Sequence, residues 1–449
     1  MSMRRIVPLA WALALCLTTA PAYAMMKTPA QNGLAARTYP IVARGNHNPW
    51  RSTAVRVAAA RQSSRPRPVT AAMPNQLTFA MVMSAVPADP NVTPGAVYRV
   101  TATNSATATL SINGANITIP RSSVRELTVT RGARQPIKRV NGRVVVGYDM
   151  GTAAQLTSDA KDPVSVVAPL AYVVANADGH LQGGLDSAEI AAARATGAQI
   201  WPIVQSGFNP AQTTALLHSL PARWTTLSQM VSIAGQTGIS GINIDFEDMQ
   251  PSDAPLLTQL TTGVSTVLHA MGKWVSIDVT PPSSDPNWGI VYDRAALARV
   301  VDYVAVMTYD EHFPGVTGAG SVSSIPWMEQ SIQNTIAKGV PAAQILVGIP
   351  FYTRSWYVQN GQLHSAELPL TAALADLSQP GATVKWSDRQ QQDILTYVQN
   401  GTSYEIWLEN AASLRLRGRF IQSAGLAGAA IWDLAQGSPQ YVADLTQSF

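Results

Sequence analysis

The sequence predicts an α/β protein, a (β/α)₈ TIM barrel preceded by a small N-terminal β-module. From Arg143 onward, short apolar runs typical of strands alternate with helical stretches, which is the pattern of repeated βα units. Eight such runs occur in roughly 300 residues, which favours a closed barrel over an open sheet. One of them carries acidic residues on alternate positions, and a strand covered by helices has room for acids only where its inner face opens into a site.

The chain begins with the features of a secretory signal, residues 1–24. Two arginines precede an apolar stretch that ends at about Thr18, and a small-x-small sequence, Ala22-Tyr23-Ala24, follows. We expect cleavage after Ala24 and an exported protein, secreted or periplasmic. No later apolar run has the length of a membrane span. The only cysteine, Cys16, lies in this signal, so we expect neither a disulfide framework nor a cysteine metal site.

Residues 25–75 are rich in Ala, Arg, Pro, Asn and Ser without a sustained period, which predicts a basic, disordered linker. Charge is placed unevenly along the whole chain. The first 145 residues hold 18 Lys and Arg against two acids, whereas the remainder holds 13 against 25. A basic N-terminal third on an acidic body suggests two tasks. We expect the basic part to meet an anionic surface, cell wall or outer membrane rather than nucleic acid.

Residues 76–140 change in texture and predict the small β-module. The strand-like runs Val97–Thr103 and Thr107–Ile112 are followed by an Asn113-Gly114 hairpin turn and a third run, Ile117–Pro120. The pattern resembles bacterial Src-homology-3-like wall-binding domains. Two alternatives stay open: a wall-binding module, or a structural extension packed on the barrel.

Residues 141–449 are assigned to the barrel. Its eight expected strands are Val144–Gly147, Val164–Ala168, Ile200–Val204, Gly241–Phe246, Val275–Val279, Val304–Met307, Ile345–Ile349 and Ala427–Ile431.

The fourth of these runs is the most informative stretch of the chain. Positions 242, 244 and 246 carry Ile, Ile and Phe, whereas positions 241, 243, 245 and 247 carry Gly, Asn, Asp and Glu. A period of two indicates a strand with one apolar and one polar face. The polar face ends in two carboxylates, which predicts a catalytic site at the C-terminal mouth of the barrel.

This stretch resembles the signature of family 18 glycoside hydrolases, the chitinase-like enzymes, which reads Asp-Gly-x-Asp-x-Asp-x-Glu. Gly241, Asp245 and Glu247 match it, whereas Ser240 and Asn243 replace two of its aspartates. The variant is most similar to bacterial spore-cortex and other peptidoglycan N-acetylglucosaminidases. Further matches span the barrel region: Val146-Gly147-Tyr148, Met307-Thr308-Tyr309-Asp310, Gly348-Ile349-Pro350-Phe351-Tyr352 and Ala430-Ile431-Trp432.

The two carboxylates differ in the chemistry they could perform. Partial desolvation and the charge of Asp245 would raise the pKa of Glu247, which suits a general acid. Asp245 lies two residues away on the same face, so it cannot attack the opposite side of a sugar. Enzymes of the resembled family use the substrate's own 2-acetamido oxygen instead. The resemblance then implies that Asp245 binds the acetamide N–H and that Tyr309 donates a hydrogen bond to the acetamide oxygen.

The resemblance also implies a set of substrate-binding residues. Trp432 would be the floor beneath the reacting sugar, because a flat apolar ring matches the C–H face of a pyranose. Asp310 would bind a sugar hydroxyl or position Asp245. We also expected the amide of Asn243 to donate to Asp245 and lower its pKa. The remaining candidates for the cleft are Met307, Tyr148, Tyr352, Arg354 and Trp356.

Other chemistries find little support in the sequence. The six His show no ligand spacing, and neither a Gly-x-Ser-x-Gly elbow nor a Gly-rich phosphate loop occurs, so we expect no metal and no cofactor. The resulting hypothesis is an exported retaining hydrolase of β-1,4-linked N-acetylglucosamine glycans, with peptidoglycan placed before chitin oligomers. The alternative is a lectin-like barrel that binds such glycans without cutting them. Endo or exo action stays open.

Overall fold

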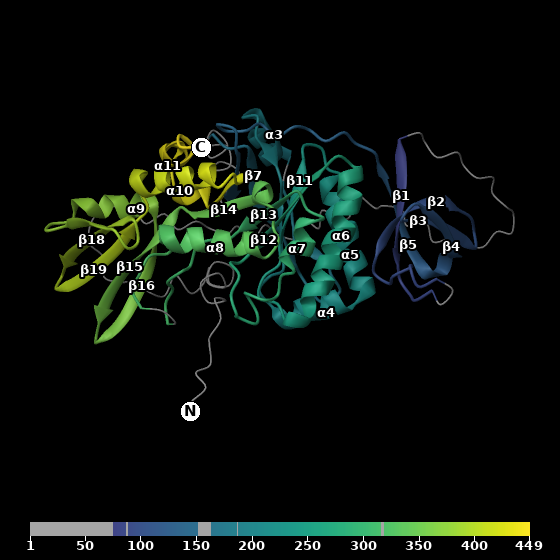
Figure 1. Cartoon of the computed structure of the whole chain (residues 1–449), viewed down its shortest axis with the longest axis horizontal. Coiled ribbons are helices and arrows are strands. Elements are labelled where there is room, and N and C mark those ends of the chain that lie inside the picture. The colour runs from purple at the N-terminus through teal and green to yellow at the C-terminus, as the bar shows by residue number, and fades with distance from the viewer. Residues whose placement is uncertain (1–74, 87–88, 151–162, 186, 316–317) are drawn as a thin grey trace, which may run out of the picture.

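The protein is described from a computed structural model, which covers residues 75–86, 89–150, 163–185, 187–315 and 318–449 (Figure 1). The expected signal, residues 1–24, and the expected linker, residues 25–75, lie outside these ranges except for residue 75.

A closed ring of eight parallel strands forms the body of the molecule, which confirms the predicted barrel. Neighbouring strands pair in chain order, β14 pairs β20, β20 pairs β6, and pairing of β7 with β10 completes the ring. Two short strands, β8 (Leu181–Gly183) and β9 (Gln199–Ile200), pair with β7. The barrel strands are β6 (Val144–Asp149), β7 (Val166–Val174), β10 (Ile203–Gln205), β11 (Gly241–Asp245), β12 (Trp274–Val279), β13 (Tyr303–Val306), β14 (Ile345–Pro350) and β20 (Gly428–Trp432).

Helices surround the ring, and local sequence explains where several of them begin. Asn209 caps the first turn of α4, with proline at the next position, and Asn410 opens α10 with a capping box. No helix of the described residues is both long and apolar enough to cross a membrane. The helices of the described barrel region are α3 (Ser187–Ala195), α4 (Pro210–His218), α5 (Leu220–Ala234), α6 (Ala254–Ala270), α7 (Arg294–Ala298), α8 (Ile325–Ala337), α10 (Ala411–Ser423) and α11 (Pro439–Thr446), with 3₁₀ turns η3 (Pro251–Asp253), η4 (Ala342–Gln344) and η6 (Leu434–Gln436).

Because side chains alternate between the two faces of each barrel strand, the apolar residues form two separate cores, one outside the ring and one inside it. Ile242 and Ile244 of β11 point outward and join the cluster that includes Leu260 and Val264 of α6. A second cluster fills the inside of the ring, with Trp201 at its N-terminal end stacked 6.2 Å from Trp274, ring centroid to ring centroid. Outward residues therefore hold the helices, and inward residues close the bottom of the barrel.

Gly241 opens β11 because nothing larger fits beside this aromatic plug. A Cβ at that position would lie 2.7 Å from the carbonyl oxygen of Trp274 and 2.8 Å from Cδ1 of Trp201. Real Cβ atoms do not approach other atoms so closely. The glycine of the signature thus has a packing reason at the closed end of the barrel, away from the acids.

The N-terminal sheet packs on the outer surface of the barrel beside α5 and α6 (Figure 1). Phe79, Met81 and Val129 belong to the same apolar cluster as the barrel helices. A hydrogen bond of 2.9 Å from Gln259 Nε2 of α6 to the carbonyl of Pro94 ties the two parts together. The sheet has the antiparallel order β4-β3-β2-β1-β5, with β1 (Gln76–Val82), β2 (Val97–Thr103), β3 (Thr107–Ile112), β4 (Ala115–Pro120), η2 (Arg121–Ser123) and β5 (Val124–Thr130).

A second antiparallel sheet is inserted between β14 and β20, and the sequence analysis did not anticipate it. Two of its three hairpin turns, Asn360-Gly361 and Asn400-Gly401, have φ values of +52° and +73°, and +52° and +78°. These are the Asn-Gly turns that favour tight hairpins, so the signal was present. The strand order is β16-β15-β19-β18-β17, and the elements are β15 (Tyr352–Gln359), β16 (Gln362–Pro369), α9 (Leu370–Ala375), η5 (Asp376–Ser378), β17 (Thr383–Ser387), β18 (Gln392–Gln399) and β19 (Thr402–Leu408).

The packing of the N-terminal sheet gives a stability prediction. Met81 is 1 % exposed between β1 and the barrel helices, so Met81→Ala should lower the free energy of unfolding by about 2–5 kcal/mol. Chemical denaturation followed by tryptophan fluorescence measures this. Val398→Ala, at a side chain 60 % exposed, is the control and should change little. An unchanged barrel transition in Met81→Ala would show that the N-terminal sheet unfolds independently.

Candidate active site

The end of β11 places two carboxyl groups side by side at the C-terminal mouth of the barrel. Asp245 is 3 % exposed and Glu247 is 1 % exposed. Gln205 on the neighbouring β10 donates from Nε2 to Oδ2 of Asp245 at 3.0 Å. Ser206 fixes the backbone of Glu247, whose N–H donates to the Ser206 hydroxyl at 3.1 Å. Both acids are thus held by the strand that precedes β11 in the ring.

The two acids titrate differently because they interact with one another. Burial is the main cause that raises the pKa of Glu247 well above its usual range, and the negative charge of Asp245 adds to it. Burial also raises the pKa of Asp245, but hydrogen bonds from Gln205 and Glu247 oppose the rise. The pKa of Glu247 is thus raised more strongly than that of Asp245, so Glu247 is the better proton donor of the pair. This arrangement suits a general acid beside an anion.

Asn243 does not donate to Asp245, contrary to our expectation. Its Nδ2 donates to Ser276 Oγ at 3.0 Å and to Asp278 Oδ1 at 2.9 Å, both on β12. The same Asp278 oxygen accepts a hydrogen bond of 2.6 Å from the hydroxyl of Tyr148. Asn243 and Tyr148 are therefore joined through a third buried carboxyl group.

Tyr309 and its neighbours form the part of the mouth at the ends of β13, β14 and β20. Tyr309 and Met307 lie in one buried cluster with Tyr352, against which Trp432 packs. The Tyr352 hydroxyl donates to Oδ1 of Asp310 at 2.7 Å. Burial raises the pKa of Asp310, and the charge of Arg354 opposes the rise. Asp310 is therefore held by Tyr352 at the start of β15.

Trp432 ends β20 and is the most exposed of the eleven candidates, since it is only partly buried. Its ring centroid lies 5.4 Å from that of Tyr148, with the planes inclined by 59°. The peptide bond between Trp432 and Asp433 is cis. A partly exposed indole packed against a buried tyrosine has the form of a stacking platform. Glu247, Met307, Tyr309 and Asp310 line one cavity at this mouth, whereas Trp356 lies on the inserted sheet.

Comparisons with known proteins place the chain in a family. The family model described as "Glycosyl hydrolases family 18" matches residues 215–437. The chain belongs to family 18 of the glycoside hydrolases. The resemblance noted in the sequence is thereby confirmed.

Individual relatives of this family 18 protein are distant in sequence. The cortical fragment-lytic enzyme of Bacillus subtilis is 26% identical over 233 residues, which cover 50% of this chain and 53% of that one. The chain thus spans about half the length of curated relatives that it matches. A chitinase from Chromobacterium violaceum superposes with a TM-score of 0.62 at 25% identity, covering 68% of this chain and 98% of that one. The spore cortex-lytic enzyme SleL of Bacillus cereus shares the fold, with a TM-score of 0.63 at 19% identity and coverage of 72% and 77%.

A cavity of about 280 Å³ opens next to the acid of this family 18 barrel. Glu247 and Tyr309 line it together with Trp288 and Trp327. The cavity therefore combines the acid with aromatic surface. Within the described ranges, no group of three or more His, Cys, Asp or Glu is arranged to hold a metal ion.

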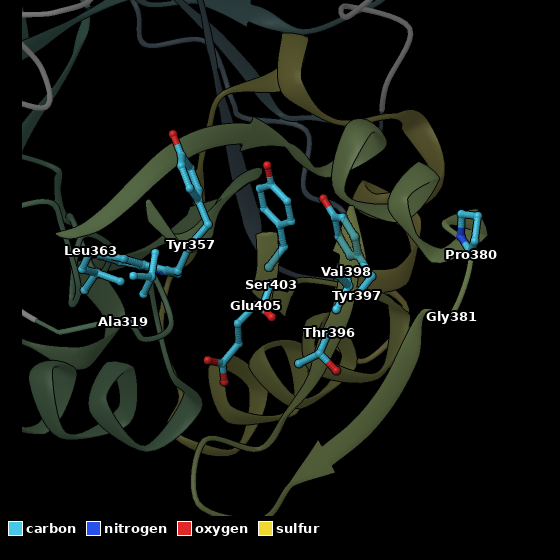
Figure 2. Close-up of a pocket in the computed structure, with 13 residues that line it drawn as sticks. Ala319, Tyr357, Leu363, Pro380, Gly381, Thr396, Tyr397, Val398, Ser403 and Glu405 are labelled. Atoms are coloured by element: carbon cyan, nitrogen blue, oxygen red, sulfur yellow. The ribbon is translucent and has the colours of Figure 1, made fainter. Parts of the chain in front are cut away.

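A larger hollow, about 540 Å³, lies on the inserted sheet, and Trp356 is the one residue named from the sequence among those that line it. Figure 2 shows the rings of Tyr357 and Tyr397 on one side of the sheet and the side chains of Thr396 and Glu405 on the other. Tyr357, Tyr404 and Tyr397 come from adjacent strands, with ring centroids 5.2 Å and 5.0 Å apart. This hollow belongs to the insertion rather than to the carboxyl cluster.

Sequence reasoning missed Gln205 and Asp278 in the family 18 site. Asp278 follows the same period-two pattern as β11, because Ser276 and Asp278 alternate with the buried Val275 and Ile277. That alternation was a usable signal. Gln205 ends its strand and is fully buried, but a single glutamine in an apolar run gives little warning of a catalytic neighbour.

The buried position of Glu247 gives the first prediction for activity. Glu247→Gln keeps the side-chain shape but removes the proton donor, so hydrolysis should fall on the order of 10²–10⁴-fold while sugar binding persists. Release of reducing ends measures turnover, and calorimetry measures binding. Glu405→Gln on β19 is the matched control. A Glu247→Gln variant that keeps more than about a tenth of the activity would assign the acid role to another group.

Proposed function

We propose that this family 18 protein is an exported hydrolase that cleaves β-1,4 bonds after N-acetylglucosamine with retention of configuration. The observation that carries the proposal is the placement of Asp245 and Glu247, two residues apart at the end of β11 and buried against one another's charge. Carboxyl groups placed side by side at the end of one strand cannot flank a sugar ring held between them. Both therefore act from one side of the substrate, and the attacking group has to come from the substrate itself.

The proposed first step needs no nucleophile from the protein. The acetamide carbonyl oxygen forms a bond to C1 as the glycosidic C1–O bond breaks, and the departing oxygen takes the proton of Glu247. The positive oxazolinium ion that forms presents its N–H to the Asp245 carboxylate, which stabilises the developing charge. Tyr309 would donate to the acetamide oxygen and hold it in line.

The second step restores the enzyme. Glu247, now a carboxylate, takes a proton from water as the water oxygen bonds to C1 and the bond from C1 to the acetamide oxygen breaks. Two inversions at C1 give net retention. Trp432 would support the reacting sugar, and the cavity beside Glu247 would take the departing sugar.

The substrate class is proposed from two sources. The relatives named above include a cortical fragment-lytic enzyme, a spore cortex-lytic enzyme and a chitinase, which supports an N-acetylated glycan. The basic N-terminal segment favours an anionic wall as the place of action, so we put peptidoglycan before chitin oligomers. A digest of purified peptidoglycan and of chitin, analysed by mass spectrometry, decides between them. Binding to both without new reducing ends would support the lectin-like alternative.

Dependence on the acetamide is the sharpest test of the mechanism. Substrates with a free amine at the cleaved sugar should resist hydrolysis, because they lack the attacking oxygen. A thiazoline mimic of the cyclic intermediate should inhibit competitively. Turnover is measured on matched acetylated and deacetylated oligomers. Efficient cleavage of the amine would rule out substrate assistance and require an enzymic nucleophile.

Wall attachment is tested separately from catalysis. Residues 25–74 contain eight Lys and Arg and no acid, and they precede the packed N-terminal sheet. Deleting them should lower retention on intact wall at low salt and leave turnover of a small soluble substrate unchanged. The difference should shrink with added salt, because the Debye length is about 8 Å at physiological ionic strength and shorter above it. Equal retention at low salt would reduce this segment to a tether.

A further inference from the structure

The carboxyl group of Asp278 contacts Asn243, the residue inside the barrel at which this chain departs from the family signature. Where that pattern has an aspartate, this chain has Asn243, whose Nδ2 donates to Asp278 Oδ1 at 2.9 Å. Tyr148 donates to the same oxygen at 2.6 Å. A carboxylate missing from β11 is thus matched by one supplied from β12.

We propose that Asp278 replaces the missing aspartate of position 243 as the positioning residue that shares one negative charge with Asp245. This inference rests on the proposed hydrolytic function. It concerns a residue on a different strand from the signature, and its role is to act on Asp245 rather than on the sugar.

The strand register brings the two aspartates to the same height. Asn243 pairs with Ser276 and Ile244 with Ile277, so one further step sets Asp245 level with Asp278. Neighbouring strands lie about 4.8 Å apart, closer than the roughly 7 Å between residues i and i+2 of one strand. Asp278 is therefore at least as near to Asp245 as an aspartate at position 243 would be.

Burial makes a carboxyl group at this position costly. Asp278 is 4 % exposed, Tyr148 2 % and Asn243 1 %. Inward-facing positions on other strands, such as Val146, Ala168 and Ala305, carry apolar side chains. A buried acid costs several kcal/mol unless it is hydrogen-bonded, and an apolar residue would be more stable in its place. A group that is expensive for folding fits a role in the chemistry.

The charges around Asp278 explain how it acts. Burial raises the pKa of Asp278 well above its usual range, and the charge of Asp245 raises it further. The two carboxyl groups therefore compete for one negative charge, because each disfavours ionisation of the other. The groups that interact electrostatically with Asp278 come from four elements or their ends: Asp245, Glu247, Tyr148, Tyr292 and Tyr309.

Exchanging the two side chains tests the inference directly. Asp278→Asn should lower kcat at least tenfold, and its pH profile should move to lower pH, because the remaining acids lose a like-charged neighbour. Asn243→Asp alone adds an acid and should move the profile to higher pH. The double variant Asn243→Asp/Asp278→Asn restores one acid and one amide, and it should recover activity to within about threefold of the wild type.

A matched control separates positioning from packing. Ser276→Ala removes the other acceptor of the Asn243 amide but no acid, so its pH profile should stay in place. Thermal unfolding of all variants shows whether they fold. A double variant no more active than Asp278→Asn, with both folded, would overturn the inference.

Direct titration keeps the inference apart from the proposed function. Carboxyl ¹³C NMR of the wild type and of Asp278→Asn should show a lower pKa for Asp245 in the variant. An unchanged Asp245 titration overturns the inference whether or not the protein hydrolyses glycans. A wild-type protein that releases no reducing ends overturns the proposed function, and the shift in titration still decides the role of Asp278.

Discussion

A closed ring of strands fixes which side chains share the barrel interior, and the rest of the molecule follows from that constraint. On β11, Ile242 and Ile244 pack against the helices outside the ring. Because side chains alternate along a strand, Asn243 and Asp245 face inward. At the bottom of the ring the interior is filled by the aromatic rings around Trp201. The C-terminal mouth is left for polar groups, and the carboxyl groups of Asp245, Glu247 and Asp310 lie there.

Burying several acids together needs compensation, and the donors that this barrel uses for the inner acids are neutral. Gln205 donates a hydrogen bond to Asp245, and Tyr148 and Asn243 each donate one to Asp278. Neutral donors satisfy the oxygens without cancelling the negative charge, whereas a lysine or arginine would cancel it. The mouth thus keeps an excess of negative potential, which would stabilise the positive charge that develops on the sugar in the proposed reaction. The cost in folding and the gain in catalysis come from the same groups.

Local alternation predicted the barrel strands and drew attention to the two acids of β11, and the resemblance to the family supplied the other candidates. The partner of Asn243 could not be found in that way. We expected its amide to bind Asp245, two residues along the same strand. A residue on a neighbouring strand is closer than one two positions along the same strand. In the structure the amide donates to Asp278 and Ser276 of β12. Which strands neighbour one another, and in which register, is a property of ring closure.

The inserted sheet escaped prediction for a related reason. Its strands follow β14 directly, so their apolar residues read as part of the barrel that we assigned to residues 141–449. Only the two Asn-Gly turns distinguish these hairpins from βα units. The N-terminal sheet was easier to recognise, because a strongly basic segment without a period precedes it.

The insertion is part of the site because of where its first strand begins. Only Phe351 separates β14 from β15, and its N–H donates to the carbonyl of Trp432 at 2.7 Å. The next residue is Tyr352, whose hydroxyl holds Asp310. The same short segment therefore ties the stacking tryptophan of β20 to the acid that follows β13. A shift of the inserted sheet would reach both contacts, whereas the acids on β11 and β12 are held by the ring itself. The barrel thus fixes the proton chemistry, and the start of the insertion fixes the surface on which the sugar would lie.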